Sequence, residues 1–270
     1  KRETYGAQPP LELMRQMVDH GGWYDRKTLK FKYIVDVTLV GAMGPPGGGR
    51  QPVTNRMMRH LHCLSFVDMS EAAIKGIFNT ITEAFLLSTF GEEKKGLAAP
   101  IVGATVEIFN HACATLLPTP AKSHYIFNLR DVSKVIQGVL MADKRRVSEP
   151  EHLVNLWGHE CTRTFSDRLV SAEDKAWFVE QIKAATKAHF NMDYKKLRPA
   201  ESQELLYCDF FTPGYDPSIY EEVTSQAKLT DLINEHLAEY NEQNIPMNLV
   251  MFGDAVAHIC RICRVLRQPG

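Results

Sequence analysis

The first 69 residues combine one helical pattern with two runs typical of strands. Leu11, Met14 and Met17 recur at helical spacing, directly after a Pro-Pro pair that suits the first turn of a helix. The run Tyr33 to Ala42, YIVDVTLVGA, is rich in β-branched and apolar residues and is followed by glycine and proline, which predicts a strand buried on both faces. Leu64 to Val67 predicts a second short strand. The pattern indicates part of an α/β fold.

From residue 70 onward the apolar residues recur with the period of helices. Stripes at 3.6-residue spacing predict one amphipathic helix after residue 70 and another from Pro100 to Leu117. Asn128 is expected to cap a further helix, and Ser171-Ala-Glu-Asp174 matches a capping box. The remaining predicted helices begin at Pro150 or span Lys228 to Tyr240 and Asn248 to Arg267. The fold class is therefore α/β followed by an all-α part, mostly helical.

Composition and charge exclude several classes of protein. The 31 basic and 32 acidic residues leave a net charge of −1 and are interspersed, which argues against partners such as nucleic acid or a membrane surface. No run reaches targeting length or the ~20 apolar residues of a membrane span. The chain begins with Lys1 and ends on a turn signal, Leu266-Arg-Gln-Pro-Gly270, so we expect an internal piece of a longer polypeptide.

The six cysteines show no regular spacing and are predicted to be reduced, cytosolic thiols. Cys260 and Cys263 form the one CxxC pattern of the sequence, and His258 could supply a third zinc ligand. Because the two cysteines lie on the apolar face of a predicted helix and no second CxxC exists, the core interpretation is favoured over a metal site. No metal site is predicted.

The loop from Gly44 to Gln51, GPPGGGRQ, nearly matches a phosphate-binding loop. It stands at the carboxyl end of a predicted strand, where open α/β sheets bind ligands. However, Arg50 and Gln51 replace the required Lys and Ser or Thr, and Pro45 and Pro46 have no N–H to offer a phosphate. Two alternatives remain for this loop. It is a surface turn without a function, or it is the phosphate site of a small self-contained enzyme. The two prolines and the missing Lys argue against the enzyme.

Three arginines are candidates for anion contacts. Arg56 and Arg59 are three residues apart in a short helix that Thr54-Asn55 can cap, so they project to nearly the same side. Arg130 falls in the first turn of the helix after Asn128, where a cation opposes the helix dipole. An anionic partner would explain each placement, and a solvated basic face is the alternative. No GxSxG, HExxH or paired-carboxylate motif points to other chemistry, and His60, His62, His124 and His159 are interpreted as packing or surface residues.

A set of longer motifs carries a resemblance to a known family. The runs YGAQPPLELMRQ, GGWYDR, AMGPPGGGR, TNRMMRHL, LLPTPAKSHYIFNLRDVSKVIQG and HECTRTFSDRL resemble the third AAA+ module of an axonemal dynein heavy chain, from a point after its Walker B strand. The ending, MNLVMFGDAVAHICRICRVLRQPG, resembles the opening helices of the fourth module. The resemblance covers essentially the whole chain. It implies a division into the C-terminal part of a large α/β subdomain (1–69), a helical lid (70–192), a linker (193–218) and helices of the next module (219–270).

The resemblance also implies roles for individual residues. Arg130 matches the sensor II arginine, which reaches from the lid to the nucleotide phosphates. Arg56 and Arg59 match the arginine-finger region presented to the nucleotide of the preceding module, with Arg59 slightly favoured. Gly44 stands at the sensor I position, usually a polar residue that orients the attacking water, which puts hydrolysis by this module in doubt.

The implied protein is the ATP-driven, minus-end-directed microtubule motor of cilia and flagella, located in the axoneme, cytoplasm and cytoskeleton. The resemblance implies ATP or ADP with Mg²⁺ in the complete module, with Walker A and Walker B upstream, so the chain alone is expected to be inactive and to bind no cofactor. The implied partners of this segment are neighbouring AAA+ modules of the same heavy chain. Other regions of the heavy chain, which include a coiled coil, are implied to contact microtubules and dynein intermediate and light chains. Neither nucleic acid nor membrane is expected as a partner. The alternative is a noncatalytic AAA+-derived scaffold with a structural or regulatory role.

Overall fold

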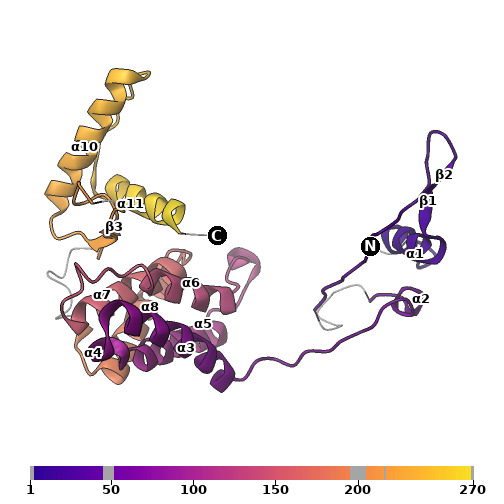
Figure 1. Cartoon of the computed structure of the whole chain (residues 1–270), viewed down its shortest axis with the longest axis horizontal. Helices are drawn as coiled ribbons and strands as arrows, with labels where there is room; N and C mark the ends of the chain where they lie inside the picture. Colours follow the sequence, from indigo (N-terminus) through magenta and orange to yellow (C-terminus); the bar gives the residue numbers. More distant parts are fainter. Residues whose placement is uncertain (1–2, 45–51, 195–204, 216, 269–270) are drawn as a thin grey trace. The chain divides into compact units, whose positions relative to one another are not determined.

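The computed structural model describes residues 3–44, 52–194, 205–215 and 217–268. The chain divides into two compact units, Lys1–Asp68 and Met69–Gly270. Each unit has its own elements, coloured along the sequence in Figure 1. Secondary structure in the described residues is mostly helical, as the sequence pattern predicts.

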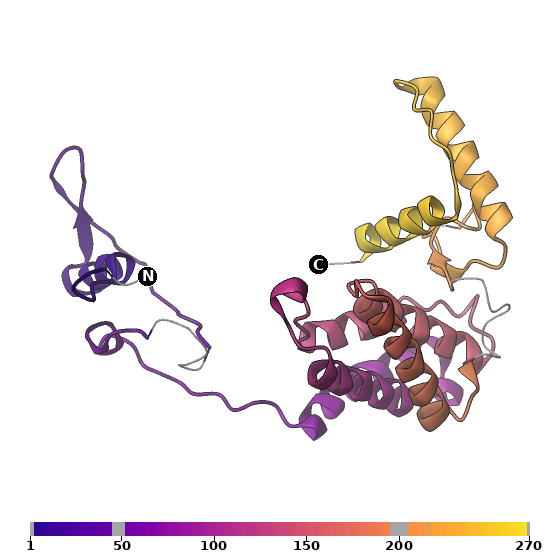
Figure 2. The ribbon, with the colours of Figure 1, turned by 180° about the vertical axis from the view of Figure 1, so that it is seen from behind.

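The first unit is built around helix α1 (Pro9–His20), which begins at the predicted Pro-Pro pair. The helix ends at Gly21, whose φ of 70° is left-handed and whose N–H donates to the Met17 carbonyl over 2.8 Å. Strands β1 (Gly22–Tyr24) and β2 (Phe31–Tyr33) form an antiparallel hairpin, which extends above α1 in Figures 1 and 2. Trp23 Nε1 donates to the Leu13 carbonyl over 2.7 Å and fastens the hairpin to α1.

The predicted strand from Tyr33 to Ala42 is wrong for most of its length. Only Tyr33 belongs to a strand, and residues 34–44 are not paired with any described strand. Asp36 interrupts the extended run because its φ of 60° is left-handed, a conformation incompatible with a β-strand. The expected burial is also missing, since Val40 is 94% exposed. The second predicted strand, Leu64 to Val67, pairs with no strand in the described part of the chain and is likewise exposed.

The second unit consists mainly of helices that pack on one another. Its core helices are α3 (Glu71–Phe90), α4 (Glu92–Lys95), α5 (Ala98–Thr115), α6 (Leu129–Val139), α7 (Pro150–Cys161) and α8 (Ala172–Phe190), with a 3₁₀ turn η1 (Pro120–Lys122) and a π-helical turn η2 (Thr162–Ser166). Asn128 and Ser171 cap α6 and α8 as predicted, and at α6 the Asp131 carboxylate completes the capping box by accepting the Asn128 N–H over 3.0 Å.

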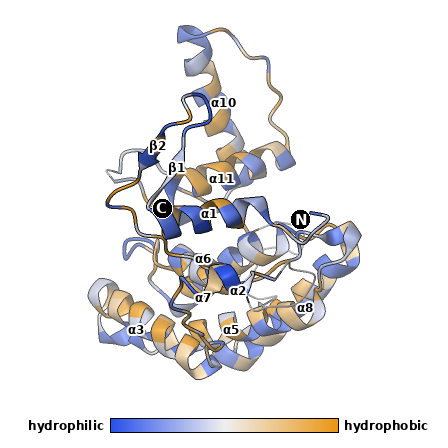
Figure 3. Ribbon diagram, turned by 90° about the vertical axis from the view of Figure 1, so that its right-hand side faces the viewer, coloured by the Kyte–Doolittle hydropathy of each residue, from blue (hydrophilic) through white to orange (hydrophobic). Residues whose placement is uncertain are grey.

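Helix α5 lies at the centre of this core. Ile101, Val102 and Val106 are fully buried and contact apolar residues of the surrounding helices. By length and composition alone, the stretch Glu92–Thr115 could cross a membrane, but half of its most apolar window is buried inside the protein. Burial in the helical core accounts for the apolar character of this stretch. Figure 3 shows hydrophobic residues along both α3 and α5.

The C-terminal part of this unit joins a helical hairpin to a short two-stranded sheet. Strands β3 (Tyr207–Cys208) and β4 (Glu221–Glu222) are antiparallel, and helices α10 (Gln226–Gln243) and α11 (Gly253–Arg267) follow. Cys260 of α11 is buried with Cys208 and Phe211 in a small apolar cluster. The core interpretation of Cys260 is therefore confirmed, and Cys263 beside it is partly exposed.

Candidate functional site

Arg130 lies in the first turn of α6 and points its charge into solvent. Its backbone N–H donates to the Asn128 side chain over 2.9 Å, as the capping geometry requires, and its residue is exposed. Among the described residues, no acidic group pairs with its guanidinium. A cation at the N-terminus of a helix is repelled by the helix dipole, so the dipole of α6 does not stabilise the charge of Arg130.

The carboxylate of the next residue along the chain is paired with another arginine. Asp131 is buried, and Arg168 Nη2 donates to its Oδ1 over 2.6 Å. The Arg168 guanidinium also lies 5.0 Å from the centre of the Phe127 ring. Arg168 therefore neutralises Asp131, and the charge of Arg130 remains available for an incoming anion.

The two other predicted arginines belong to the first unit, in and after the short helix α2 (Asn55–Met58). Arg59 Nη2 lies 3.2 Å from Asp19 Oδ1, and His60 Nε2 lies 3.0 Å from the same oxygen. Arg15 also pairs with Asp19. Burial raises the pKa of Asp19, but the hydrogen bond from Arg59 and the neighbouring cations outweigh it and lower that pKa overall. Arg59 is thus held by a carboxylate while 65% of its side chain stays exposed.

Arg56 is exposed, and no partner of its side chain is found among the described residues. Gly44, the sensor I position, lies in an irregular stretch and is partly buried. The rest of the predicted phosphate-like loop, residues 45–51, lies outside the described residues. Arg56 and Arg59 lie in and directly after α2, and Arg130 belongs to the other unit.

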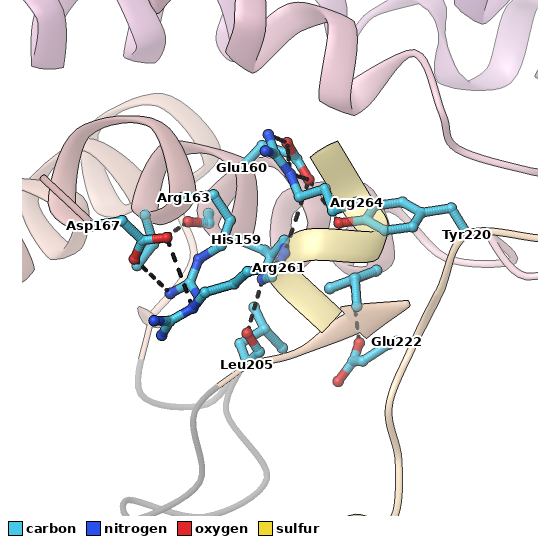
Figure 4. Close-up of polar contacts among 12 residues, drawn as sticks. His159, Glu160, Arg163, Asp167, Leu205, Tyr220, Glu222, Arg261 and Arg264 are labelled. Atoms are coloured by element: carbon cyan, nitrogen blue, oxygen red, sulfur yellow. Dashed lines mark hydrogen bonds and ion pairs between the residues drawn. The ribbon is translucent and has the colours of Figure 1, made fainter. Parts of the chain in front are cut away.

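A buried polar network joins α7 to α11 in the second unit (Figure 4). The Glu160 side chain is fully buried, and Arg264 Nε donates to its two oxygens over 3.1 and 3.0 Å. Arg264 Nη2 makes a further contact with Glu160 Oε2. Tyr220 donates its hydroxyl to Glu160 Oε1 over 3.0 Å. Burial, followed by the Glu160 charge, raises the pKa of Tyr220 well above its usual value, so the phenol stays protonated and keeps donating.

His159 extends the network toward strand β3. Its Nδ1 lies 2.8 Å from the Leu205 carbonyl, so Nδ1 carries the proton and donates. Burial, and then the charge of Arg163, hold the pKa of His159 well below 6.5. Arg163 and Arg261 both reach Asp167, at 3.3 and 3.8 Å. The network thus combines a neutral imidazole with paired charges. This arrangement is suited to holding α7 and α11 together.

Sequence reasoning missed this network. Glu160 and Arg264 are 104 residues apart, and neither belongs to a motif with a chemical signature. The one local signal is that Glu160 falls among the apolar positions of α7, where an acidic residue requires a buried partner. Among the described residues, no three potential metal ligands lie together, so the network contains no metal-binding arrangement.

Comparisons with known proteins identify the class. The family model described as the P-loop containing dynein motor region matches residues 1–69, and the AAA+ lid domain matches residues 101–197. These matches define a dynein-type AAA+ protein, with a motor-region segment followed by a lid domain.

Individual relatives narrow the class to one family. Dynein axonemal heavy chain 1 of Mus musculus is 47% identical over 279 residues, which cover 98% of this chain and 6% of the relative. The Homo sapiens dynein axonemal heavy chain 1 is 48% identical over the same span, and the human dynein axonemal heavy chain 3 is 41% identical over 278 residues, or 99% of this chain and 7% of that relative. The chain belongs to the axonemal dynein heavy chain family. It spans about 6% of the length of these relatives.

Proposed function

We propose that this chain is the part of an axonemal dynein heavy chain that supplies lid and inter-module arginines to nucleotide sites of the AAA+ ring. Dynein heavy chains are AAA+ motor ATPases, and family membership places the chain in the axoneme of cilia and flagella. The whole heavy chain is then the ATP-driven, minus-end-directed microtubule motor. Microtubules and the intermediate and light chains contact other regions of it.

The observation that carries the proposal is the exposed charge of Arg130, which no acidic group in the described part of the chain pairs. Its guanidinium opposes the helix dipole, and Arg168 has already neutralised Asp131 beside it. A solvent-facing cation in this position favours a phosphate-bearing ligand, which can accept two parallel hydrogen bonds from the planar guanidinium. Arg130 is the sensor II residue in this proposal, and it contacts the phosphates of the nucleotide bound by the same module.

Arg59 is the favoured arginine finger for the preceding module. The pair with Asp19 restrains the arginine while most of its side chain remains exposed, which lowers the entropy lost when it meets a phosphate. Arg56 is exposed on the same short helix without a restraining carboxylate among the described residues, so it is the second candidate. Either would stabilise charge on the transferring phosphoryl group.

The nucleotide and Mg²⁺ require residues beyond these arginines. No cluster of three acidic, histidine or cysteine side chains occurs among the described residues, so this segment fits the phosphates of ATP or ADP better than the metal. In the proposed assignment, Walker A and Walker B residues of the heavy chain hold Mg²⁺ and the triphosphate. This segment alone would then have no ATPase activity.

The test is Arg130→Ala in the complete heavy chain, with nucleotide affinity measured at this module by a fluorescent ATP analogue. We expect about a tenfold weaker Kd, or roughly 1.4 kcal/mol, from the lost phosphate contact. Lys134→Ala, an exposed cation one turn further along α6, is the matched control and should leave the Kd unchanged. An unaltered Kd in Arg130→Ala would favour the noncatalytic scaffold, which the glycine at position 44 also favours because it has no side chain to orient water.

A further inference from the structure

The loop between α6 and α7 contains a short basic run followed by a serine. Its sequence is Lys144-Arg145-Arg146-Val147-Ser148, so two arginines stand three and two positions before Ser148. Ser148 is exposed, directly before Glu149, the N-cap of α7. Protein kinases that select basic substrates bind such paired guanidiniums with acidic side chains, and the charge pattern decides which serine is used. We propose that Ser148 is a phosphorylation site for an arginine-directed serine/threonine kinase.

The reaction is a phosphoryl transfer from ATP. Ser148 Oγ attacks the γ-phosphorus, and the new Oγ–P bond forms as the bond from the γ-phosphorus to the β,γ-bridging oxygen breaks. ADP leaves with that electron pair, and the hydroxyl proton passes to the carboxylate base of the kinase. The kinase supplies the base and its own Mg²⁺, so this chain contributes only the hydroxyl and the recognition arginines.

Arg145 is the more accessible of the two recognition residues. It pairs with Asp143, with Nε 2.9 Å from Oδ1 and Nη2 2.6 Å from Oδ2, and 41% of its side chain is exposed. Such exposed pairs contribute at most about 1 kcal/mol, so an acidic kinase groove can replace Asp143 as the partner. Recognition by Arg145 therefore requires little disturbance of the fold.

Arg146 connects the loop between α6 and α7 to the segment that precedes α10. Its Nε lies 2.6 Å from Glu221 Oε2, and its Nη2 donates to Thr212 over 3.0 Å. The loop itself is a single turn in which the N–H groups of Arg146 and Val147 both donate to the Asp143 carbonyl, over 3.0 and 3.1 Å. Because a kinase binds its substrate extended, this turn must open locally and the buried Val147 must leave its apolar cluster, which is still a smaller event than unfolding of the helices around it.

One lysine beside Ser148 offers a cation to the phosphorylated side chain. Lys94 Nζ of α4 donates to the Ser148 carbonyl over 2.7 Å, and His152 Nδ1 lies 3.4 Å from Ser148 Oγ. A phosphate adds about −1.5 to −2 charge, which the start of α7 and Lys94 would stabilise. The Glu149 and Glu151 carboxylates oppose it. Lys94 would move from the carbonyl to the phosphate and bind α4 to the start of α7 more tightly.

The sequence offers a matched serine for comparison. Ser133 is exposed and stands three residues after Arg130, so it shares the arginine at the same spacing. However, it lies inside α6, whose hydrogen bonds keep it from becoming extended. If the arginine pair and the loop geometry select the site, Ser148 is modified and Ser133 is not.

The experiment treats the complete, folded heavy chain with Mg-ATP and the catalytic subunit of an arginine-directed kinase, and follows each site by phosphopeptide mass spectrometry. We expect Ser148 to be modified at least tenfold faster than Ser133, and Arg145→Ala to slow modification of Ser148 at least tenfold. Ser148→Ala should remove that phosphopeptide. No phosphate on Ser148, or a rate that Arg145→Ala leaves unchanged, would overturn the proposal. Arg145 is exposed, so its variant is expected to keep the fold, and circular dichroism verifies this.

Discussion

Glu160 of α7 and Arg264 of α11 form a buried ion pair across 104 residues of sequence. The carboxylate is fully buried and receives three donated groups, two from the arginine and one from Tyr220. A buried charge of this kind is tolerated only while its partners stay in place. The pair therefore links the helices matched as an AAA+ lid to the C-terminal hairpin.

Arg264→Met is expected to destabilise the contact between α7 and α11 strongly. Removing one partner leaves Glu160 buried and unpaired, a change that costs about 3–5 kcal/mol. Hydrogen–deuterium exchange of the complete heavy chain measures it, as faster exchange of α7 and α11. Arg267→Met serves as the control, because Arg267 lies on the same helix but its pair with Asp209 is 43% exposed on the arginine side. Equal exchange in the two variants would mean that the buried pair does not hold the helices.

Gly138→Ala tests the same carboxylate from a third helix. In an exposed helix interior this substitution stabilises by about 1 kcal/mol, because alanine has the higher helix propensity. At position 138 an added Cβ would overlap the Glu160 carboxyl group, which Arg264 and Tyr220 prevent from moving away. We therefore expect destabilisation of at least about 1–3 kcal/mol, the cost of overpacking.

The matched control for Gly138→Ala is Gly76→Ala in α3, where an added Cβ meets nothing within 4 Å and stabilisation is expected. Both variants are tested in the complete heavy chain. Hydrogen–deuterium exchange at increasing temperature gives the thermal midpoint of the helical core for each variant. A stable Gly138→Ala protein would show that Glu160 is free to shift.

His159 makes the stability of this junction depend on pH. Its pKa in the folded protein lies well below 6.5, mainly because of burial, whereas the unfolded side chain titrates near 6.5. Below that value the unfolded state binds more protons than the folded state, so the free energy of unfolding falls as the pH falls. The loss is at most about 1.4 kcal/mol per pH unit from this group.

The measurement compares exchange of α7 at pH 7.5 and 5.5, corrected for intrinsic rates, in the wild type and in His159→Gln. Glutamine keeps an N–H donor for the Leu205 carbonyl and does not titrate, so we expect it to remove part of the pH dependence. His124→Gln is the comparison, because His124 is exposed and hydrogen-bonds to a backbone carbonyl as well. A pH response that is identical in His159→Gln and the wild type would contradict this role.

Local sequence signals predicted the helices and the caps at Asn128 and Ser171, whereas Thr54 makes no side-chain hydrogen bond at the start of α2. Asn128 and Ser171 cap their helices because a short polar side chain can satisfy an N–H two or three residues ahead, a relation contained within one turn. The strand predicted from Tyr33 to Ala42 failed because a strand depends on partners, and its apolar residues alone cannot supply a ladder. Glu160 and Arg264 could not be predicted for the same reason, since their contact depends on how distant helices pack.

The exposed apolar segments of the first unit lead to a last prediction. Val40 is 94% exposed, and Phe66 and Val67 are 88% and 91% exposed, in two extended segments with no described strand beside them. Unpaired extended backbone with apolar side chains is a template for pairing between molecules. We expect the 270-residue chain by itself to associate and to elute from size-exclusion chromatography as polydisperse material.

Lysine at these positions should reduce that association. The double variant Val40→Lys and Phe66→Lys places a charge in each segment, which opposes edge-to-edge pairing, so the aggregated fraction measured by light scattering should fall at least twofold. Thr38→Lys adds a charge in the same stretch without removing an apolar side chain, and a smaller effect is expected there. A wild-type chain that is monodisperse and melts cooperatively would contradict the argument, because the exposed segments would then be harmless.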